Sequence, residues 1–507
     1  MLTIIDGFLN KTTMYRLVLY YLAGLTLAAM VMGLFGLIPY GPLAIFLSAL
    51  FFVGVCWLTN YAFARAFAAP TNVESVYITA LILTLIVNPL DSLTDPYFFS
   101  TALFASVCAI GSKYIFAIGK KHIFNPAALG VALPALAVGL SAGWWVGTAA
   151  MMPFVLLGGL AVVRKIRHLD LVAGYFLVGF ASIAVMYGPS VGDVGSALWR
   201  MLLHSSLLFF VFVMLTEPLT TPPQRWARIL YGGIVGFLSV LPAHVGSFYF
   251  TPELALIAGN VFSYLVSPKQ KLFLKLKEKV KVAENTYDYV FESARALSYR
   301  PGQYMEWTLA HAHPDNRGNR RYFTLASSPA EPDLRLGLKF YSPASTFKNA
   351  LSAMKVGDSV VASQLSGEFV LPEDTKRKLA FIAGGIGVTP FRSMILDLLD
   401  RGEARDAVLL YSNKTVSEIA YRDIFDRASR ELGIRTVYAL TAEPSVPAWA
   451  HGGPIDARLI AESMPDYRER TFYISGPHAM VNAFKKTLRD MGVPRRQIKV
   501  DFFPGYA

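Results

Sequence analysis

The sequence predicts a multi-domain chain: a polytopic α-helical membrane domain of about ten helices, then an antiparallel β-barrel, then a doubly wound α/β domain. The first observation is charge. Of the 47 Lys+Arg and 35 Asp+Glu, residues 1–268 contain only 12 and 8, and the rest of the chain contains 35 and 27. Second, residues 1–268 form a series of long apolar runs. Third, alternating strand patterns give way near residue 375 to strand–turn–helix units. We therefore place the domains at 1–268, 269–374 and 375–507.

The apolar runs of the first domain are mostly long enough for membrane-spanning helices, which need about 20 apolar residues. We place them at 15–38, 42–58, 75–92, 97–118, 125–142, 145–163, 170–187, 201–217, 229–249 and 252–267. An even number of spans returns the chain to the side on which it began.

Basic residues flank these runs unevenly. If the N-terminus is cytoplasmic, Arg200 is the outer basic residue of the domain and the other 11 of its 12 Lys and Arg face inward. This asymmetry follows the positive-inside rule. It predicts a multi-pass protein of a bacterial inner membrane, with both termini and the soluble half in the cytoplasm. Spread positive charge favours membrane lipid as a partner, and no nucleic-acid partner is predicted.

The chain has two cysteines, Cys56 and Cys108, and both lie within apolar runs. Two thiols cannot supply the four ligands of a usual iron–sulfur cluster. We therefore predict no iron–sulfur cluster and no metal site, so that organic cofactors must carry any electrons.

Two segments near the predicted inner face combine proline with polar residues. They are Gly111–Ala128, which contains Phe124-Asn125-Pro126-Ala127, and Thr216–Pro223, which contains Glu217-Pro218. An Asn-Pro pair at a helix start leaves backbone N–H groups available to an anionic or polar ligand. The alternative is a pair of rigid turns whose lysines meet lipid phosphates. Both interpretations stay open at this point.

The Phe-Asn-Pro-Ala block, the Glu-Pro turn and the ten runs resemble the family of membrane subunits that the Rnf complex shares with the sodium-translocating NADH:quinone reductase. The resemblance implies flavins within the membrane, one of them an FMN joined to a Thr in an Asp-x-[Ser/Thr]-[Ser/Gly]-Ala-Thr motif. The corresponding loop here, Asp193–Leu198, ends in a leucine, which has no hydroxyl to esterify. We therefore predict no covalent FMN. A non-covalent flavin or a quinone in this domain stays open, as do other electron-transport proteins as partners.

Four segments of the soluble half have patterns suited to phosphate and ring binding. Arg320–Thr324 offers a guanidinium for pyrophosphate, aromatic faces and a hydroxyl. Pro343–Lys348 opens a helix with two hydroxyl groups. Ala383–Pro390 and Ile474–Pro477 each join a strand to a helix through glycine, which lets the backbone approach a pyrophosphate.

These segments, in this order and with Pro301-Gly302-Gln303-Tyr304 and the C-terminal Asp501–Tyr506, resemble the ferredoxin–NADP reductase superfamily over residues ~272–507. The resemblance implies bound FAD, with NADH or NADPH as substrate. It assigns Arg321 to the FAD pyrophosphate, Phe323 to ring stacking and Thr324 to flavin N5, and it places Thr324, Ser475 and Phe503 at the reacting rings. The remaining residues that it assigns to the two cofactor sites are Tyr322, Ser345, Thr346, Gly384, Gly385, Gly387, Thr389, Pro390, Gly476 and Pro477. Phe323 stands where the family usually has Tyr, and Ser475 where it often has Cys.

We therefore expect an FAD-dependent NAD(P)H oxidoreductase that passes electrons from NAD(P)H through FAD into the membrane domain. The acceptor is a quinone, a flavin or a molecule across the membrane. One alternative is a component of a redox-driven Na⁺ or H⁺ pump, and another is a reductase whose membrane half serves only as an anchor or docking subunit. Lys414 or Arg422 could meet the 2′-phosphate of NADPH or be solvated surface charges.

Overall fold

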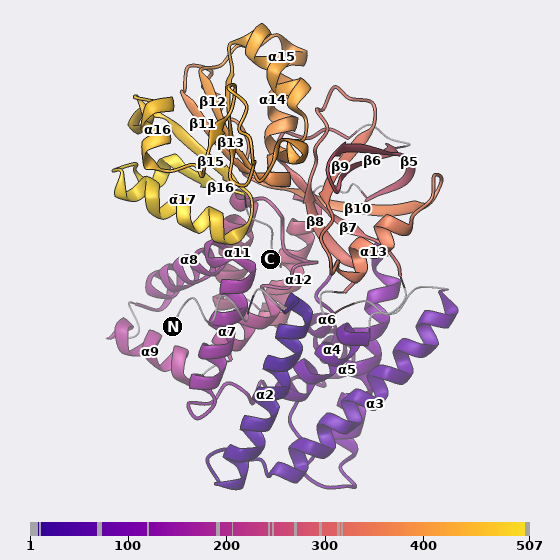
Figure 1. Cartoon of the computed structure of the whole chain (residues 1–507). Coiled ribbons are helices and arrows are strands. Elements are labelled where there is room, and N and C mark those ends of the chain that lie inside the picture. Colours follow the sequence, from indigo (N-terminus) through magenta and orange to yellow (C-terminus); the bar gives the residue numbers. More distant parts are fainter. Residues whose placement is uncertain are drawn as a thin grey trace. The chain divides into compact units, whose positions relative to one another are not determined.

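The computed structural model describes residues 9, 12–67, 73–118, 121–188, 193–204, 206–241, 244–245, 248–267, 271–293, 297–311, 315 and 318–501. The chain divides into two compact units, Met1–Lys269 and Gln270–Ala507, each described by itself below (Figure 1). The finer division of the second unit at residue 374 stays a prediction.

The described part of the first unit is mainly helical. Its sequence consists largely of long apolar runs, and a helix that is apolar on all sides suits a buried or membrane environment. Its helices are α2 (Met14–Leu34), α3 (Pro42–Ala66), α4 (Val73–Ile86), α5 (Pro96–Ile115), α6 (Pro126–Val138), α7 (Met152–Ile166), α8 (Leu169–Tyr187), α9 (Val194–His204), α10 (Leu207–Phe209) with the π-helix η2 (Phe210–Met214), α11 (Arg225–Val240) and α12 (Pro252–Val266). Two short hairpins join them, β1–β2 (Ala117–Ile118, Lys121–His122) and β3–β4 (His244–Val245, Phe248–Tyr249). Each predicted apolar run overlaps a helix.

Proline and capping residues set the helix starts. Asn125 caps α6 because its side chain accepts a hydrogen bond from the Ala128 N–H at 3.0 Å, and Pro126 occupies the first turn. This is the helix start that the Asn-Pro pair predicts. The helix ends at Gly139, which adopts a left-handed φ of 72°. The chain then runs without helix until α7, although its sequence remains apolar.

Four described helices, α2, α3, α5 and α8, are long and apolar enough to cross a membrane, and the bent pair α9 and α10–η2 makes a fifth if it forms one span. α4, α6 and α12 are apolar but shorter, because Gly139 ends α6 and α4 stops just before Asn88-Pro89. The ten-helix membrane domain therefore stays a prediction. What the structure supports is a helical region with about four membrane-compatible helices.

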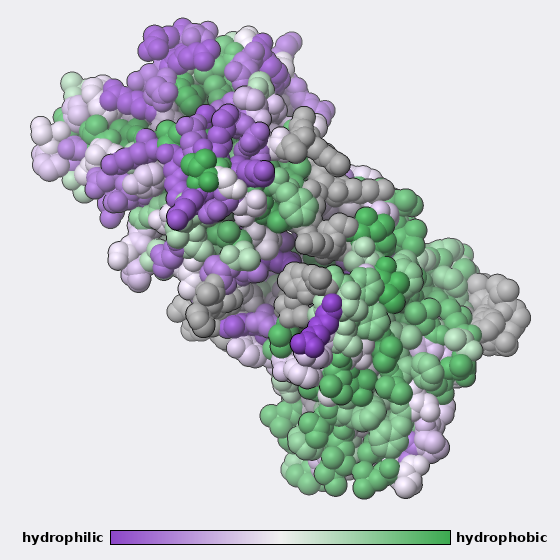
Figure 2. Space-filling model, turned by 90° about the vertical axis from the view of Figure 1, so that its right-hand side faces the viewer, coloured by the Kyte–Doolittle hydropathy of each residue, from purple (hydrophilic) through white to green (hydrophobic). Residues whose placement is uncertain are grey.

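The surface of the first unit carries many large hydrophobic side chains, seen as green residues in Figure 2. Leu34, Leu157 and Val185 are at least two-thirds exposed. In the second unit, the described residues of this kind are only Phe273, Tyr341, Val356, Val446 and Trp449. An apolar surface of this extent is compatible with membrane association.

Helices α8 and α11 approach closely because glycines line their contact. A Cβ at Gly174 would lie 2.6 Å from the Ile229 carbonyl oxygen, and a Cβ at Gly232 would lie 3.1 Å from the Tyr175 nitrogen. A Cβ at Gly236 would overlap the Tyr175 carbonyl oxygen. Small residues at such a contact let two backbones pack without intervening side chains.

Gly236→Ala should therefore lower the stability of the first unit by about 1–3 kcal/mol, because backbone atoms cannot move aside as a side chain can. The measurement is thermal unfolding of the purified protein in detergent. Gly24→Ala is the matched control, since no atom lies within 4 Å of that Cβ position. Equal melting temperatures for the two variants would contradict this packing.

The second unit begins with a six-stranded antiparallel sheet. Its strands are β5 (Lys271–Ala283), β6 (Thr286–Ser293), β7 (Tyr304–Thr308), β8 (Arg320–Thr324), β9 (Leu334–Lys339) and β10 (Ser359–Ser366), in the order β8-β7-β10-β5-β6-β9. Its core contains Phe291, Trp307 and Phe347, the last from helix α13 (Thr346–Ala353). We call this part the barrel lobe, after the predicted barrel.

A parallel sheet follows, as the strand–turn–helix pattern predicts. Its strands are β11 (Leu379–Gly384), β12 (Ala407–Asn413), β13 (Arg435–Leu440), β14 (His451–Gly452), β15 (Thr471–Ser475) and β16 (Ile498–Val500), in the order β14-β13-β12-β11-β15-β16. Its helices are α14 (Thr389–Arg401), α15 (Arg422–Leu432), α16 (Ala457–Ser463) and α17 (His478–Asp490). Phe381 packs with α14 on one face and Ile382 with α16 and α17 on the other, so the sheet is covered on both sides. We call this part the α/β lobe.

Candidate functional site

The two glycine turns of the α/β lobe meet at one edge of its sheet. Strands β11 and β15 are parallel neighbours, with Ala383 opposite Ser475, so their carboxyl ends lie side by side. A Cβ at Gly387 would lie 2.5 Å from the Gly476 Cα and 2.7 Å from the Ser475 carbonyl oxygen. The structure thus brings together the segments 383–390 and 474–477, which the sequence selects separately.

These turns form a backbone cradle at the start of α14. A Cβ at Gly476 would lie 2.6 Å from the Met480 Cε, and Gly385 adopts a left-handed φ of 52°. Residues 385–388 form a 3₁₀ turn that leads into α14, with Pro390 in its first turn. Glycines that leave room beside a helix N-terminus suit the pyrophosphate of a dinucleotide.

In the barrel lobe, the Arg321 guanidinium is buried at the side of β8. It donates to the Asp315 carboxylate at 2.9 and 3.2 Å and to the Gly318 carbonyl oxygen at 2.8 Å. It also lies 5.1 Å from the centre of the Phe347 ring. A bound pyrophosphate would compete with Asp315 for these N–H groups.

The predicted phosphate residues of α13 lie beside this arginine. The Ser345 side chain caps the helix by accepting from the Lys348 N–H at 3.3 Å. The Thr346 hydroxyl accepts from the Asp315 N–H at 3.0 Å and lies 3.1 Å from His311 Nε2. Arg321 and Thr346 therefore converge through Asp315, which the sequence did not identify.

The aromatic residues of β8 point to different neighbours. Tyr322 donates its hydroxyl proton to Glu306 Oε2 at 2.9 Å and packs edge-on against Tyr304. Phe323 lies 6.0 Å from Phe347, ring centre to ring centre. The half-buried Phe323 ring thus shares the Arg321 face of the strand, and its stacking on a flavin stays a prediction.

Asp501 connects the two lobes at the strand ends. Its Oδ2 accepts hydrogen bonds from Thr324 Oγ1 at 3.4 Å and from Ser475 Oγ at 3.1 Å. Two of the three residues assigned to the reacting rings, Thr324 on β8 and Ser475 on β15, are therefore joined through one carboxylate. Sequence reasoning included Asp501 only as part of a C-terminal motif. Its place after β16, the parallel neighbour of β15, is the signal that it missed. Phe503 lies outside the described residues.

The two candidates for a 2′-phosphate contact differ. The Arg422 guanidinium lies 3.7 Å from the centre of the Trp449 ring, and its Nε donates to Asp426 at 3.2 Å, so its charge is engaged within the lobe. Lys414 is exposed at the end of β12. Among the described residues, no group of three or more His, Cys, Asp or Glu side chains could hold a metal ion.

The donor set fits two dinucleotide-like ligands. Arg321, the α13 N-terminus and Thr346 offer donors for one pyrophosphate, and the glycine cradle of α14 offers space and N–H groups for another. The two positions converge on the Thr324–Asp501–Ser475 contact. An antiparallel lobe and a parallel α/β lobe arranged in this way define a two-lobed, dinucleotide-binding oxidoreductase module.

Comparison with known proteins agrees with this class. Residues 381–486 match the family described as oxidoreductase NAD-binding domain. The flavohemoprotein of Halalkalibacterium halodurans is 28% identical over 229 residues, 42% of this chain and 54% of that protein. NADH-cytochrome b5 reductase 1 of Aspergillus terreus is 26% identical over 240 residues, 45% of this chain and 80% of that protein. Among solved structures, a cytochrome P450 reductase of Amycolatopsis gives a TM-score of 0.42 at 25% identity, over 46% of this chain and 70% of that one.

Residues 381–486 thus match an NAD-binding oxidoreductase domain, and the second unit is similar to parts of a flavohemoprotein and of a cytochrome b5 reductase. The chain spans about half the length of the flavohemoproteins that it matches. The resemblance of the first unit to membrane subunits of the Rnf complex and the sodium-translocating reductase stays a prediction, because the family match lies within the second unit.

Gly387→Ala should abolish most nicotinamide binding while leaving FAD bound, because the added methyl group meets backbone of the neighbouring turn rather than a flexible side chain. We expect the NADH dissociation constant to rise about tenfold or more, which corresponds to at least about 1.4 kcal/mol. Titration of the flavin absorbance with NADH measures it. In the control, Gly452→Ala, the new methyl would meet only the Val446 side chain. A Gly387→Ala variant that binds NADH normally would contradict the cradle.

Proposed function

We propose that the protein is a membrane-bound flavoprotein that oxidises NAD(P)H through FAD and delivers the electrons to an acceptor at its helical unit. The observation that carries the proposal is the Thr324–Asp501–Ser475 contact between the two lobes. The family match at residues 381–486 and the membrane-compatible helices of the first unit support it.

FAD, when bound, accepts a hydride from reduced nicotinamide and releases electrons one at a time to an acceptor. The chain's own work is positioning. Arg321 and Thr346 would hold the FAD phosphates, and Gly384, Gly387 and Thr389 the nicotinamide dinucleotide. Thr324 and Ser475 would orient the two rings. Hydride transfer needs donor and acceptor atoms about 3–3.5 Å apart in aligned orbitals, so rate depends on this orientation rather than on an acid or base.

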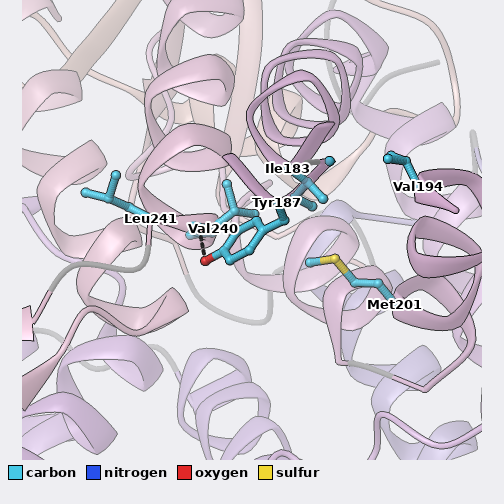
Figure 3. A pocket seen from close by; sticks show the side chains of 8 residues that line it. Ile183, Tyr187, Val194, Met201, Val240 and Leu241 are labelled. Carbon is cyan, nitrogen blue, oxygen red and sulfur yellow. Dashed lines mark hydrogen bonds between the residues drawn. The ribbon is translucent and has the colours of Figure 1, made fainter. Parts of the chain in front are cut away.

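A cavity in the first unit is a candidate acceptor site. It has a volume of about 390 Å³ and is lined by Ile183, Tyr187, Gly188, Val194, Met201, Ser239, Val240 and Leu241. Figure 3 shows the Tyr187 hydroxyl pointing to the Val240 carbonyl oxygen, 3.3 Å away. Apolar walls with a few polar groups suit a planar ring such as a quinone head or a non-covalent flavin. The cavity is lined by Val194 and Met201 of α9, the helix that contains Leu198. The predicted loop Asp193–Leu198 is therefore mostly the start of α9, and Leu198 is the residue that stands where the resembling family has its flavin-accepting Thr.

The first test is anaerobic mixing of the purified, FAD-loaded protein with NADH or NADPH. We expect rapid loss of the flavin absorbance, and no fluorescent band on a denaturing gel. Ser475→Ala should lower the limiting rate of flavin reduction by about tenfold, because the nicotinamide loses one orienting contact. Its control is Ser429→Ala, on the exposed face of α15. A flavin that neither nucleotide reduces would refute the proposal.

A buried polar network in the first unit favours a second candidate, redox-driven ion movement. His122 Nε2 lies 3.0 Å from Glu217 Oε1, and Thr220 donates to Glu217 Oε2 at 3.2 Å. Asn125 Nδ2 donates to the Met214 carbonyl oxygen at 3.1 Å. The two polar segments selected from the sequence are thus one site. His122 lies in β2 and Glu217 in the turn after η2, and an ionisable pair enclosed by apolar segments often serves ion transfer.

If ions move with the electrons, Glu217→Gln should remove charge movement in sealed vesicles supplied with NADH. Flavin reduction should keep its wild-type rate, because the residues proposed to orient the flavin and the nicotinamide lie in the second unit. Gln keeps the size of Glu217, removes its charge and replaces one of its acceptor oxygens by an N–H donor. Asp91→Asn, in an exposed loop, is the control. Charge movement that persists in Glu217→Gln, or is absent from the wild type, would exclude this candidate and leave electron transfer alone.

A further inference from the structure

Five side chains form an ionic cluster between the barrel lobe and the α/β lobe. The barrel lobe contributes Asp288 on β6, Glu331 in the turn before β9, and Arg335 on β9. The α/β lobe contributes Arg392 on α14 and Tyr421, which precedes α15. We call this set the interlobe cluster. None of its members belongs to the glycine cradle, to the phosphate residues or to the Asp501 contact.

Arg392 is the centre of the interlobe cluster. Its guanidinium donates to Glu331 Oε2 at 2.8 Å and to Glu331 Oε1 at 3.1 Å, and also to the Ala326 carbonyl oxygen at 2.5 Å. The Arg335 Nε donates to Glu331 Oε1 at 2.8 Å. A two-pronged arginine–carboxylate pair fixes orientation as well as distance.

Asp288 and Tyr421 make the second link across the same interface. The Tyr421 hydroxyl donates to Asp288 Oδ1, and the Arg335 guanidinium lies 3.7 Å from Asp288 Oδ2. Tyr421 adopts a left-handed φ of 59°, a conformation that is strained for an aromatic residue and is kept only where its surroundings impose it. Its ring lies 5.2 Å from the Arg392 guanidinium carbon.

The charges of the two lobes are complementary in this cluster. When all are ionised, the Asp288, Glu331 and Arg335 side chains together contribute one net negative charge to the cluster, and Arg392 contributes one positive charge from the α/β lobe. Burial raises the pKa of Asp288. Burial by itself raises the pKa of Glu331, but the hydrogen bond and charge of Arg392, with the Ser328 N–H and the Arg335 charge, together hold that pKa below its usual value. Asp288 and Arg392 are each at most 5% exposed, so removing one partner leaves a buried charge without its counter-ion.

The cluster lies between the two halves of the proposed reaction site. Ala326 follows Thr324 by two residues, and Arg392 follows Thr389, the first residue of α14, by three. The Arg392–Ala326 bond therefore ties the helix of the glycine cradle to the strand end that carries Thr324. At Gly337 the lobes touch directly, because a Cβ there would lie 2.7 Å from Thr389 Cγ2.

We propose that Arg392 is a positioning residue for hydride transfer: through Glu331 and Ala326 it sets the distance between the nicotinamide cradle and the flavin strand. This inference rests on the proposed function and adds a residue that touches neither cofactor. The contacts of Arg392 fix the relative position of the two lobes and do not contribute to the affinity for either ligand.

The test uses the full-length, FAD-loaded protein in detergent, mixed anaerobically with the nucleotide that the wild type oxidises. Arg392→Gln should lower the limiting rate of flavin reduction by about tenfold to a hundredfold, the effect expected of a misplacement near 1 Å. The nucleotide dissociation constant should stay within about threefold, because the cradle is intact. The long-wavelength charge-transfer absorption of stacked nicotinamide and flavin should weaken. Arg392→Lys keeps the positive charge but loses the two-pronged guanidinium. Its limiting rate of flavin reduction should therefore lie between that of the wild type and that of Arg392→Gln.

Arg401→Gln is the matched control, because Arg401 lies on the same helix but pairs with Asp397 and Glu403 at the surface. If Arg392→Gln does not retain FAD, Tyr421→Phe replaces it, since it removes only the hydroxyl that bonds Asp288. Three results would overturn the inference. The limiting rate of Arg392→Gln could stay within about twofold of wild type, only its nucleotide affinity could fall, or Arg401→Gln could lose as much rate as Arg392→Gln. A wild-type flavin that stays oxidised would overturn the proposed function and this inference together.

Discussion

The contact on which the proposed chemistry depends is the Asp501 carboxylate held between Thr324 and Ser475. One hydroxyl ends a strand of the antiparallel sheet and the other ends a strand of the parallel sheet, so this carboxylate is where the two lobes meet at the site. Rings bound on either side must stack within a few tenths of an ångström of a fixed separation. The glycines of the α/β lobe also contribute to this geometry. Because Gly387 and Gly476 have no Cβ, the backbones of their two turns can lie in contact.

A second contact between the lobes lies behind the first. Arg392 is buried and Glu331 is half-buried, and the favourable energy of the pair must first offset the cost of taking the arginine charge out of water. Such a pair contributes more to orientation than to stability. The first unit is held together differently. Its glycines let the backbones of α8 and α11 pack in contact, and large apolar side chains cover its surface.

Local chemistry was predictable from the sequence, and long-range pairing was not. Arg321, Ser345, Gly384 and Gly387 were selected because each lies in a short segment whose turn or helix start has its own signature, and their roles at the cofactors stay predictions. Asp501 and Glu331 carry no such signature, because their role comes from partners more than 20 residues away. In the first unit, hydropathy placed the helices but overestimated several lengths. The apolar residues 140–151 have the hydropathy of a helix, yet they form none: Trp144 adopts a left-handed φ of 52° and donates its backbone N–H to the Ile86 carbonyl oxygen.

In the proposed function, electrons leave the flavin for an acceptor at the helical unit. The most direct measurement places the full-length, FAD-loaded protein in lipid vesicles, reduces the flavin anaerobically with NADH, and follows its reoxidation with and without quinone in the bilayer. If electrons take this route, the flavin reoxidises fast only when the membrane contains quinone, or another acceptor that partitions into it. Reoxidation that depends on a water-soluble acceptor and is unchanged by membrane quinone would contradict it and would leave the helices as an anchor.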